Sequence, residues 1–336
     1  MLENREILFT QKDTAEVVRC EMPSIDKNEV LIQTDYTVIS AGTEKANITD
    51  APNVGHEWPK RLGYGGSGHI IAVGSDVKDF HVGNRVLTDH LGHKAFVKAS
   101  FQKNRDGFFK INEDIDQLDA AFVVVGSMGV QGARKTNLQI GECGMVTGLG
   151  ILGMFAVQAF KNMGASPLIA VDPIKSRREI ALRLGADFAL DPSEPDFQEK
   201  VRTITDGRMV NANVEVTGSS AALLQSLKVA AFEGRISLTG CTRVSDVSID
   251  FYSMVHKPGI QIIGAHNLVR PTHDSYQGYW TRHDDFAMIL RMIKYGKMNV
   301  KPFISGVFGV EEAPKVYKEL CENPILPLGR LFDWNK

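Results

Sequence analysis

The chain has 336 residues, of which 43% are hydrophobic and 23% are charged, and its formal net charge is −2. This composition is typical of a soluble globular protein long enough for two domains with separate cores. Because the chain has neither a basic excess nor a basic stripe, its charge gives no indication of a nucleic-acid or membrane partner.

The N-terminal stretch MLENREILFT places acidic and polar residues where a secretory signal needs an apolar run, and no segment approaches the roughly 18 consecutive apolar residues of a membrane span. We therefore expect a cytoplasmic protein. The four cysteines, at positions 20, 143, 241 and 321, form no C-x-x-C pair, so we expect free thiols.

The first third of the chain consists of short runs rich in β-branched and aromatic residues, separated by Gly, Pro, Asp and Asn turns. The runs are EILFT, AEVVRC, EVLIQTDYTVIS, GHIIAVG, NRVLTDH and KAFVKA. This pattern predicts a compact β-rich domain of the barrel or sandwich kind.

From about residue 120 onward, predicted strands and helices alternate. Residues 144–148 are a candidate strand, and apolar residues at helical spacing follow as far as Met163. The next strand is 167–172, and a helix ends near Gly185. Further strands are expected at 211–218, 235–240 and 259–266. Such alternation predicts a doubly wound parallel sheet, because parallel neighbours need crossover helices.

A glycine-rich turn joins the first strand and helix of this sheet. In TGLGILG, Gly148, Gly150 and Gly153 have the G-x-G-x-x-G spacing, with Ile151 and Leu152 between the last two. This context directs backbone N–H groups and a helix N-terminus at a pyrophosphate. The second strand then ends in Asp172, which can accept hydrogen bonds from an adenosine ribose. The alternative is that Asp172 only caps the turn before Pro173.

A carboxylate at position 172 repels the 2′-phosphate of NADP, so the sequence favours NAD. Lys175, Arg177 and Arg178 weaken this argument, and Arg177 is a candidate for the adenosine pocket as well as for a solvated helix turn. The predicted cofactor site also includes residues in the three later strands, Thr217, Gly240, Gly264 and His266.

Several motifs together resemble the medium-chain dehydrogenase/reductase superfamily, which includes zinc-type alcohol, polyol and threonine dehydrogenases. They are VISAGTEKA, LGYGGSGHIIAVGSDV with VGNRV, AAFVVVGSMGVQGARK with LQIGECGMVTGLGILG, and ISGVFGVEEAPKVYKEL. The resemblance implies a GroES-like catalytic domain at 1–124, a Rossmann domain at 125–268 and a return to the catalytic domain at 269–336. It also implies a homodimer or homotetramer.

The chain departs from the zinc-type pattern at the metal ligands. Relatives have a cysteine where this chain has Ala41, a His-Glu pair at Tyr64-Gly65, and a third ligand near Val124. The four-cysteine lobe of a structural zinc is also missing, since only LTDHLGHK joins the neighbouring strands. We therefore expect no zinc. The alternative is a rearranged site built from some of His56, His69, His90, His93 and Glu44.

The motifs S/T-A-G-T-E and L-G-Y are similar to those of a branch without zinc ligands that includes bacteriochlorophyllide-type dehydrogenases. By this resemblance Thr43 relays the substrate proton, and Tyr64 stands at the lost histidine ligand and donates to the substrate oxygen. Glu44 is either a catalytic neighbour of Thr43 or a structural carboxylate paired with Arg85. His93 and His90 are candidate acids or bases, although a single histidine is often structural.

A second polar cluster lies at 264–285, with Arg270 and Arg282 as candidate clamps for a substrate anion; the alternative is a solvated loop with dimer contacts. The first functional hypothesis is a zinc-independent, NAD-dependent oxidoreductase for a secondary alcohol or ketone on a sugar-, cyclitol- or hydroxy-acid-like substrate. Two alternatives remain open, an NADPH-dependent enone or quinone reductase and a non-catalytic NAD-binding protein.

Overall fold

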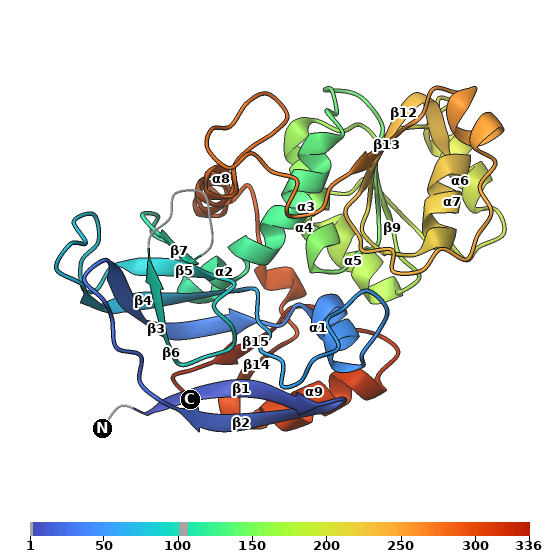
Figure 1. Ribbon diagram of the computed structural model, residues 1–336. Helices are drawn as coiled ribbons and strands as arrows, with labels where there is room; N and C mark the ends of the chain where they lie inside the picture. The colour runs from blue at the N-terminus through green and yellow to red at the C-terminus, as the bar shows by residue number, and fades with distance from the viewer. Residues whose placement is uncertain (1–2, 101–106) are drawn as a thin grey trace. The chain divides into compact units, whose positions relative to one another are not determined.

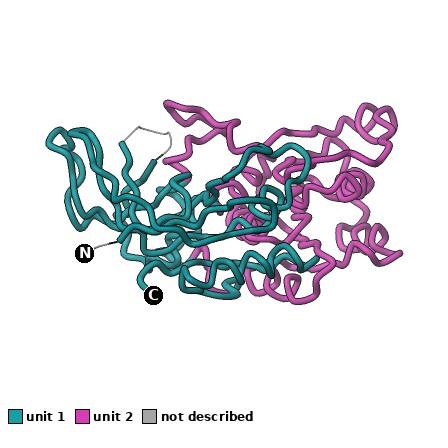
Figure 2. The backbone as a smooth tube through the Cα atoms, turned by 60° about the horizontal axis from the view of Figure 1, so that its bottom comes forward, with its two compact units in different colours: residues 1–125, 286–296, 303–336 teal, residues 126–285, 297–302 magenta. Residues whose placement is uncertain are grey.

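The computed structural model describes residues 3–100 and 107–336, and the chain divides into two compact units (Figure 2). Unit 1 comprises residues 1–125, 286–296 and 303–336, and unit 2 comprises residues 126–285 and 297–302. Unit 2 is thus inserted in the sequence of unit 1. It continues to residue 285, past the end at 268 that we expected for the Rossmann segment.

Unit 2 contains one six-stranded parallel sheet with the order β10-β9-β8-β11-β12-β13. Its strands are β8 (Gly144–Thr147), β9 (Leu168–Val171), β10 (Phe188–Leu190), β11 (Val210–Glu215), β12 (Ala230–Leu238) and β13 (Gln261–Gly264). Counted along the chain, this order is 3-2-1-4-5-6, the doubly wound arrangement that we expected. The strand order reverses between β8 and β11, and in such sheets a ligand crevice lies beyond the carboxyl ends of the strands at that point.

Helices precede and connect the strands of unit 2 (Figure 1). They are α3 (Val123–Lys135), which begins in unit 1, α4 (Ile151–Met163), α5 (Lys175–Arg183), α6 (Phe197–Ile204), α7 (Ser220–Lys228) and the π-helix η1 (Tyr252–His256). The predicted helix after the glycine turn is confirmed by α4, which ends at Gly164 with a φ of 91°. Most of its apolar residues are buried, and Phe155 and Phe160 are fully buried.

Unit 1 is β-rich, as expected. A seven-stranded sheet has the order β14-β15-β3-β4-β5-β7, with β6 also paired to β3, and β1 and β2 form a separate antiparallel pair. The strands are β1 (Asn4–Gln11), β2 (Thr14–Cys20), β3 (Glu29–Val38), β4 (Gly65–Val73), β5 (Arg85–Asp89), β6 (Phe96–Ser100), β7 (Gly107–Lys110), β14 (Gly306–Gly309) and β15 (Arg330–Asp333). Its helical segments are α1 (Ala41–Ile48), α2 (Gln117–Ala121), α8 (Arg282–Lys294, beginning in unit 2), η3 (Val310–Glu312) and α9 (Ala313–Glu322); η2 (Lys301–Phe303) lies at the last unit boundary.

The main core of unit 1 is assembled from segments far apart in the sequence. Phe9 from β1, Ile39 after β3 and Tyr317 from α9 belong to one cluster of buried side chains, together with Phe332 from β15. Phe9 and Tyr317 meet edge to face, with ring centroids 4.8 Å apart. Apolar burial of this kind is the dominant favourable contribution to folding, so the last 34 residues stabilise unit 1 rather than forming a tail.

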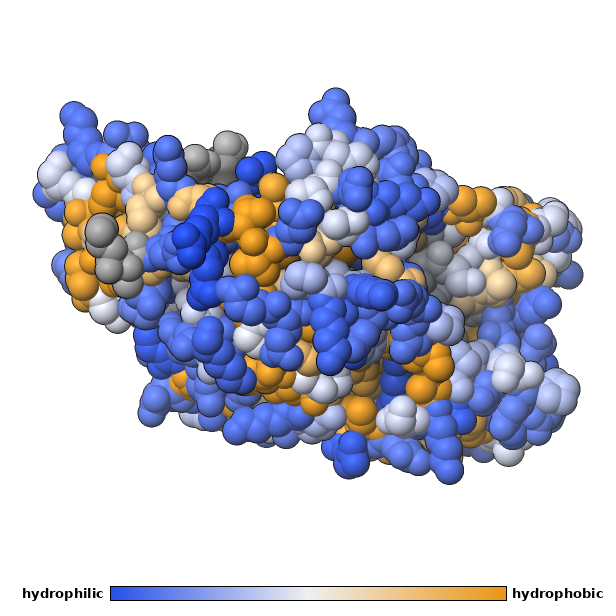
Figure 3. All heavy atoms as spheres, turned by 90° about the horizontal axis from the view of Figure 1, so that it is seen from below, coloured by the Kyte–Doolittle hydropathy of each residue, from blue (hydrophilic) through white to orange (hydrophobic). Residues whose placement is uncertain are grey.

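The face of the molecule seen in Figure 3 is mainly hydrophilic, with hydrophobic residues in separate small groups. Across residues 3–100 and 107–336, no helix has both the length and the apolar composition needed to cross a membrane.

Candidate active site

The glycine turn of unit 2 has the conformation that a dinucleotide-binding loop requires. Gly148 follows β8 with a φ of 97°, which favours glycine, and Gly150 is the N-cap of α4. A Cβ on Gly153 would lie 1.9 Å from the carbonyl oxygen of Gly148, so only glycine allows the helix to approach the strand so closely. Ile151 and Leu152 fill the first turn of α4.

Asp172 lies directly after β9 and is 3% exposed. Its carboxylate accepts hydrogen bonds of 2.8 Å from the backbone N–H groups of Leu149, in the glycine turn, and of Ile174. The second bond is the turn cap that we considered as an alternative, and the first shows a further role, because it fixes the glycine turn to β9. The residue is therefore both a turn cap and a support of the cofactor loop.

The basic residues near Asp172 each have an acidic partner. The Arg177 guanidinium lies 3.5 Å from the Asp172 carboxylate. Arg178 forms an ion pair of 2.9 Å with Asp191, and Lys175 lies 4.0 Å from Glu179 on the surface of α5. Their positive charge is thus partly neutralised at this end of the sheet.

A cavity of about 580 Å³ opens at the carboxyl ends of β8, β9 and β11 within unit 2. Among its lining residues are Gly148, Val171, Pro173, Ser193 and Thr217. The position beyond the carboxyl edge, beside the strand-order reversal, is where a doubly wound sheet binds nucleotides. The size and largely apolar lining suit the adenosine half of a dinucleotide.

Thr217 is held at the edge of this cavity by Glu215, the last residue of β11. The carboxylate accepts hydrogen bonds from the Thr217 hydroxyl and, at 2.8 Å, from its backbone N–H. Burial raises the pKa of Glu215, although the bonds from Thr217 and Gly218 oppose this shift. The other predicted cofactor residues follow later strands: a Cβ on Gly240 would lie 2.4 Å from the backbone nitrogen of Gly218, Gly264 ends β13, and His266 is exposed.

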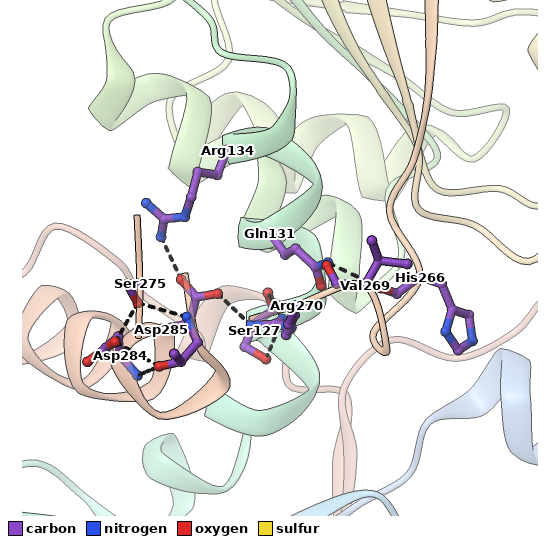
Figure 4. Close-up of polar contacts among 10 residues, drawn as sticks. Ser127, Gln131, Arg134, His266, Val269, Arg270, Ser275, Asp284 and Asp285 are labelled. Carbon is purple, nitrogen blue, oxygen red and sulfur yellow. Dashed lines mark hydrogen bonds and ion pairs between the residues drawn. The ribbon is translucent and has the colours of Figure 1, made fainter. Parts of the chain in front are cut away.

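One face of α3 holds the segment that follows β13 (Figure 4). Ser127, Gln131 and Arg134 stand at i, i+4 and i+7 on this helix, and therefore on one side of it. The Gln131 amide donates to the carbonyl oxygens of His266 at 3.2 Å and Val269 at 3.0 Å. Arg270 donates to the carbonyl oxygen of Ser127 at 2.9 Å.

Asp285 is the buried centre of this cluster, with Arg134 and Arg270 each at 2.5 Å from one of its carboxylate oxygens (Figure 4). The Trp280 ring lies 3.9 Å from the Arg134 guanidinium carbon. Burial raises the pKa of Asp285, and the two guanidinium groups oppose this shift. The expectation that Arg270 clamps a substrate anion is wrong for this conformation, because its side chain is 5% exposed and already pairs with Asp285.

In unit 1, the segment VISAGTEKA begins at the last residue of β3 and continues into α1. Thr43 therefore lies in the first turn of a helix. Glu44 is fully buried, and its carboxylate accepts hydrogen bonds from the Ser40 backbone N–H at 2.8 Å and the Tyr317 hydroxyl at 2.7 Å. Burial and this carboxylate raise the pKa of Tyr317 well above its usual range, so the phenol remains a donor.

The alternative partner for Glu44 was Arg85, and that prediction is wrong. Arg85 instead donates to the backbone carbonyl oxygens of Glu113 and Ile115. Glu44 is a structural carboxylate, as that alternative predicted. Its hydrogen bonds come from the Ser40 backbone N–H and the Tyr317 hydroxyl rather than from a guanidinium.

His93 is also part of this buried network. Its Nδ1 lies 2.8 Å from Thr37 Oγ1, and its Nε2 lies 3.3 Å from Glu44. The Trp334 indole N–H, which can only donate, forms a hydrogen bond of 3.0 Å to Thr37 Oγ1. The Thr37 hydroxyl can therefore donate to Nδ1, while the carboxylate of Glu44 at Nε2 can only accept. With both nitrogens engaged, His93 holds α1 in place.

Tyr64 lies beside the other candidate histidine. Residues 62–64 run next to residues 90–93. The backbone N–H of His90 donates to the carbonyl oxygen of Tyr64 at 2.8 Å, and that of His93 donates to the carbonyl oxygen of Leu62 at 3.0 Å. Gly63 allows this approach, since a Cβ there would lie 2.7 Å from the backbone of Gly92. The rings of Tyr64 and His90 meet edge to face, with centroids 4.9 Å apart.

The positions that carry zinc ligands in relatives are Ala41, the pair Tyr64-Gly65 and Val124, all in unit 1. Val38 pairs with Gly65 in the β3–β4 register, and Ala41 follows three residues later. A Cβ on Gly65 would lie 2.8 Å from the Cβ of Val124. The side chains of Ala41, Gly65 and Val124 provide no donor atom for zinc, and the phenol of Tyr64 is the exception. Within residues 3–100 and 107–336, no group of three or more His, Cys, Asp or Glu side chains could hold a metal ion, so the described residues do not fit one.

Two important groups were not predicted from the sequence. Tyr317 lies 273 residues from its partner Glu44, and Asp285 lies 151 residues from Arg134. No local spacing rule connects residues this far apart. The sequence signal for Asp285 was only its place at the end of the polar 264–285 cluster.

Comparisons with known proteins agree with both halves of the structure. Residues 26–111 match the family model "Alcohol dehydrogenase GroES-like domain", and residues 152–282 match "Zinc-binding dehydrogenase". D-guloside 3-dehydrogenase from Escherichia coli K12 is 26% identical, with 95% of this chain and 96% of that protein covered. L-threonine 3-dehydrogenase from Pyrococcus abyssi is 28% identical, with 87% of each chain covered.

Among solved structures, galactitol-1-phosphate dehydrogenase from Escherichia coli has the same fold, with a TM-score of 0.84, 17% identity and coverage of 98% of this chain and 99% of that one. The GroES-like match lies within unit 1, and the dehydrogenase match lies within unit 2. On these grounds the chain belongs to the zinc-type medium-chain dehydrogenase/reductase superfamily.

Proposed function

We propose that this protein is a zinc-independent, NAD-dependent oxidoreductase that interconverts a secondary alcohol and a ketone on a polar substrate. The observation that carries the proposal is the packing of Gly65 against Val124 in unit 1, two positions where zinc-type relatives have metal ligands, together with the glycine turn of unit 2. The side chains of Gly65 and Val124, like that of Ala41, offer no donor atom to zinc, which supports zinc independence, and the glycine turn supports a dinucleotide cofactor.

When bound, the nicotinamide ring accepts or supplies the hydride. The glycine turn and α4 hold the pyrophosphate through backbone N–H groups, and Asp172 holds the adenosine ribose. The buried carboxylate repels a 2′-phosphate, which supports NAD over NADP. Arg177 weakens this preference without removing it, because it already lies against Asp172.

Without zinc, side chains of unit 1 must stabilise the substrate oxygen as it gains negative charge. Thr43, in the first turn of α1, and Tyr64 are the proposed hydroxyl donors. Glu44 and His93, which we first considered as catalytic residues, are proposed to position α1 and therefore Thr43, since both are buried and mutually bonded. The substrate class follows from the relatives, whose names specify a guloside, threonine and galactitol 1-phosphate. A homodimer or homotetramer remains part of the proposal.

The test is an activity screen of purified, chelator-washed protein with polyols, glycosides and hydroxy acids, with NAD and NADP in parallel. We expect NAD reduction with at least one substrate and far less than one zinc per chain by elemental analysis. Near-stoichiometric zinc whose removal abolishes turnover would contradict zinc independence. NADH binding without turnover would instead support a non-catalytic protein, and reduction of enones with NADPH would support the reductase alternative.

A further inference from the structure

The end of β5 carries an Asp-His pair next to Tyr64. His90 Nδ1 lies 2.5 Å from the Asp89 carboxylate, whose side chain is 2% exposed, whereas the His90 side chain is 32% exposed. A buried carboxylate that holds one nitrogen of a partly exposed imidazole orients the ring.

His90 and His93 differ in the number of ring nitrogens that form hydrogen bonds. Both ring nitrogens of His93 are bonded inside the core. In His90, Nδ1 is bonded to Asp89, and in the described part of the chain no hydrogen bond or ion pair reaches Nε2. An ionised Asp89 can only accept, so the ring proton of neutral His90 belongs on Nδ1, and Nε2 presents a lone pair.

The pair lies next to a position where relatives carry a zinc ligand. In the sheet, Asp89 pairs with Gly65 on β4 and with Gly107 on β7, and neither glycine has a side chain. Gly65 is one of the positions where relatives carry a zinc ligand. In the described part of the chain, the titratable side chains in contact with the His90 ring include Asp89 on β5 and Tyr64 before β4.

The backbone of His90 also has an unusual conformation. Its φ of 59° lies in the left-handed region, which residues other than glycine seldom adopt. Here the conformation brings the His90 ring against Tyr64 immediately after the last residue of the strand.

We propose that His90, oriented by Asp89, is the general base and acid that exchanges the substrate proton in place of the zinc-bound route of relatives. This inference rests on the proposed function and names a catalytic residue for it. In alcohol oxidation, the substrate loses its C–H hydride to the nicotinamide and its O–H proton to His90 Nε2, so the carbon–oxygen single bond becomes a carbonyl. Tyr64 donates a hydrogen bond to the same oxygen, and the imidazolium pairs with Asp89. Reduction follows the reverse path.

The test compares His90→Asn, Asp89→Asn and the matched control His69→Gln. Asparagine tolerates the left-handed conformation, so His90→Asn preserves the backbone. His69 also pairs with a carboxylate on the same sheet, Asp35 at 3.2 Å, and lies outside the proposed site. We expect His90→Asn to lower kcat by about 100-fold and to remove the acidic limb of the pH profile of kcat/KM. Asp89→Asn should lower kcat with an unchanged Kd for NADH.

His69→Gln should retain the wild-type kcat and pH profile, and circular dichroism melting of each variant separates loss of folding from loss of chemistry. A wild-type acidic limb that persists in His90→Asn, with kcat intact, would overturn the proposal. If the wild-type protein turns over no substrate, the proposed function fails. In that case ¹⁵N-edited NMR of the histidine rings tests separately whether Asp89 orients the His90 ring. A His90 proton on Nδ1 that is hydrogen bonded to Asp89 supports it, whereas a ring protonated only on Nε2 rules it out.

Discussion

The hydroxyl of Tyr317 donates a 2.7 Å hydrogen bond to Glu44, across 273 residues of sequence. Glu44 lies in α1 next to Thr43, and Tyr317 lies in α9, so this contact joins the last part of the chain to the helix that carries the proposed hydroxyl relay. Both side chains are buried, and Glu44 also binds the Ser40 backbone and His93. The contact therefore couples the stability of unit 1 to the position of Thr43.

Removing this hydrogen bond should destabilise unit 1. Tyr317→Phe leaves one buried carboxylate oxygen with a donor fewer, which costs about 1–3 kcal/mol of unfolding free energy. Chemical denaturation of wild type and variant measures the difference. The control is Tyr295→Phe, because Tyr295 is 69% exposed. Equal stability of the two variants would show that the Glu44 contact contributes little.

The proposed hydroxyl donors should be required for turnover but not for cofactor binding. Thr43→Ala and Tyr64→Phe should each lower kcat by about 10-fold or more, because the developing charge on the substrate oxygen loses a donor. Thr43→Ser keeps the hydroxyl and should restore most of the rate. Stopped-flow turnover and NADH fluorescence titration separate the two effects. Unchanged kcat in both deletion variants would remove this part of the mechanism.

Cofactor preference should depend on Asp172. Asp172→Ala removes the proposed ribose acceptor, the bond to the Leu149 N–H and the charge that repels a 2′-phosphate. We expect NADH affinity to fall by about 10-fold or more, while the ratio of NADPH to NADH affinity rises. Asp172→Asn keeps an acceptor for the backbone and should retain more of the affinity for NADH. Calorimetric titration with both cofactors measures this, and an unchanged ratio in Asp172→Ala would argue against NAD selection by this residue.

The α3 cluster should depend on its buried carboxylate. Asp285→Asn leaves Arg134 and Arg270 facing each other without a counter-charge, and removing one partner of a buried ion pair costs about 3–5 kcal/mol. We expect a lower melting temperature and faster amide hydrogen exchange in residues 266–270, which this cluster holds. Asp274→Asn, at an exposed position, is the matched control. Exchange as slow as in the wild type would show that the Gln131 bonds are sufficient to hold the segment.

The thiol of Cys143 should be inert in the folded protein and should affect stability at high pH. Burial raises its pKa to about 12, so the folded state retains the proton at pH values where the unfolded thiol, near its ordinary pKa of about 8.5, loses it. Its contribution to stability is therefore complete below about pH 8.5 and is lost as the pH rises toward 12. Iodoacetamide at pH 8 should modify exposed Cys241 first, as peptide mapping can show. Cys143→Ala should flatten the alkaline loss of stability, and an unchanged slope would contradict this assignment.

Local patterns were sufficient for much of this protein. Strand-helix alternation predicted the parallel sheet of unit 2, because each element buries a face with its own period. The glycine spacing and Asp172 also lie within one strand-helix-strand stretch, so their order along the chain nearly determines their arrangement in space. Resemblance to relatives also indicated that Ala41, Gly65 and Val124 replace zinc ligands. The type of residue is enough for this prediction, because a side chain without a donor atom cannot bind zinc in any conformation.

The partners of polar groups required the tertiary structure. Glu44 pairs with Tyr317 and His93 rather than Arg85, and Arg270 is enclosed with Asp285 instead of open to a substrate. His90 and His93 are three residues apart and equivalent by sequence, yet one is partly exposed next to Tyr64 and the other is closed within the core. Residue identity determines which bonds a group can make. Only the packing of distant segments decides which bonds it makes, because burial and orientation depend on every element that folds against it.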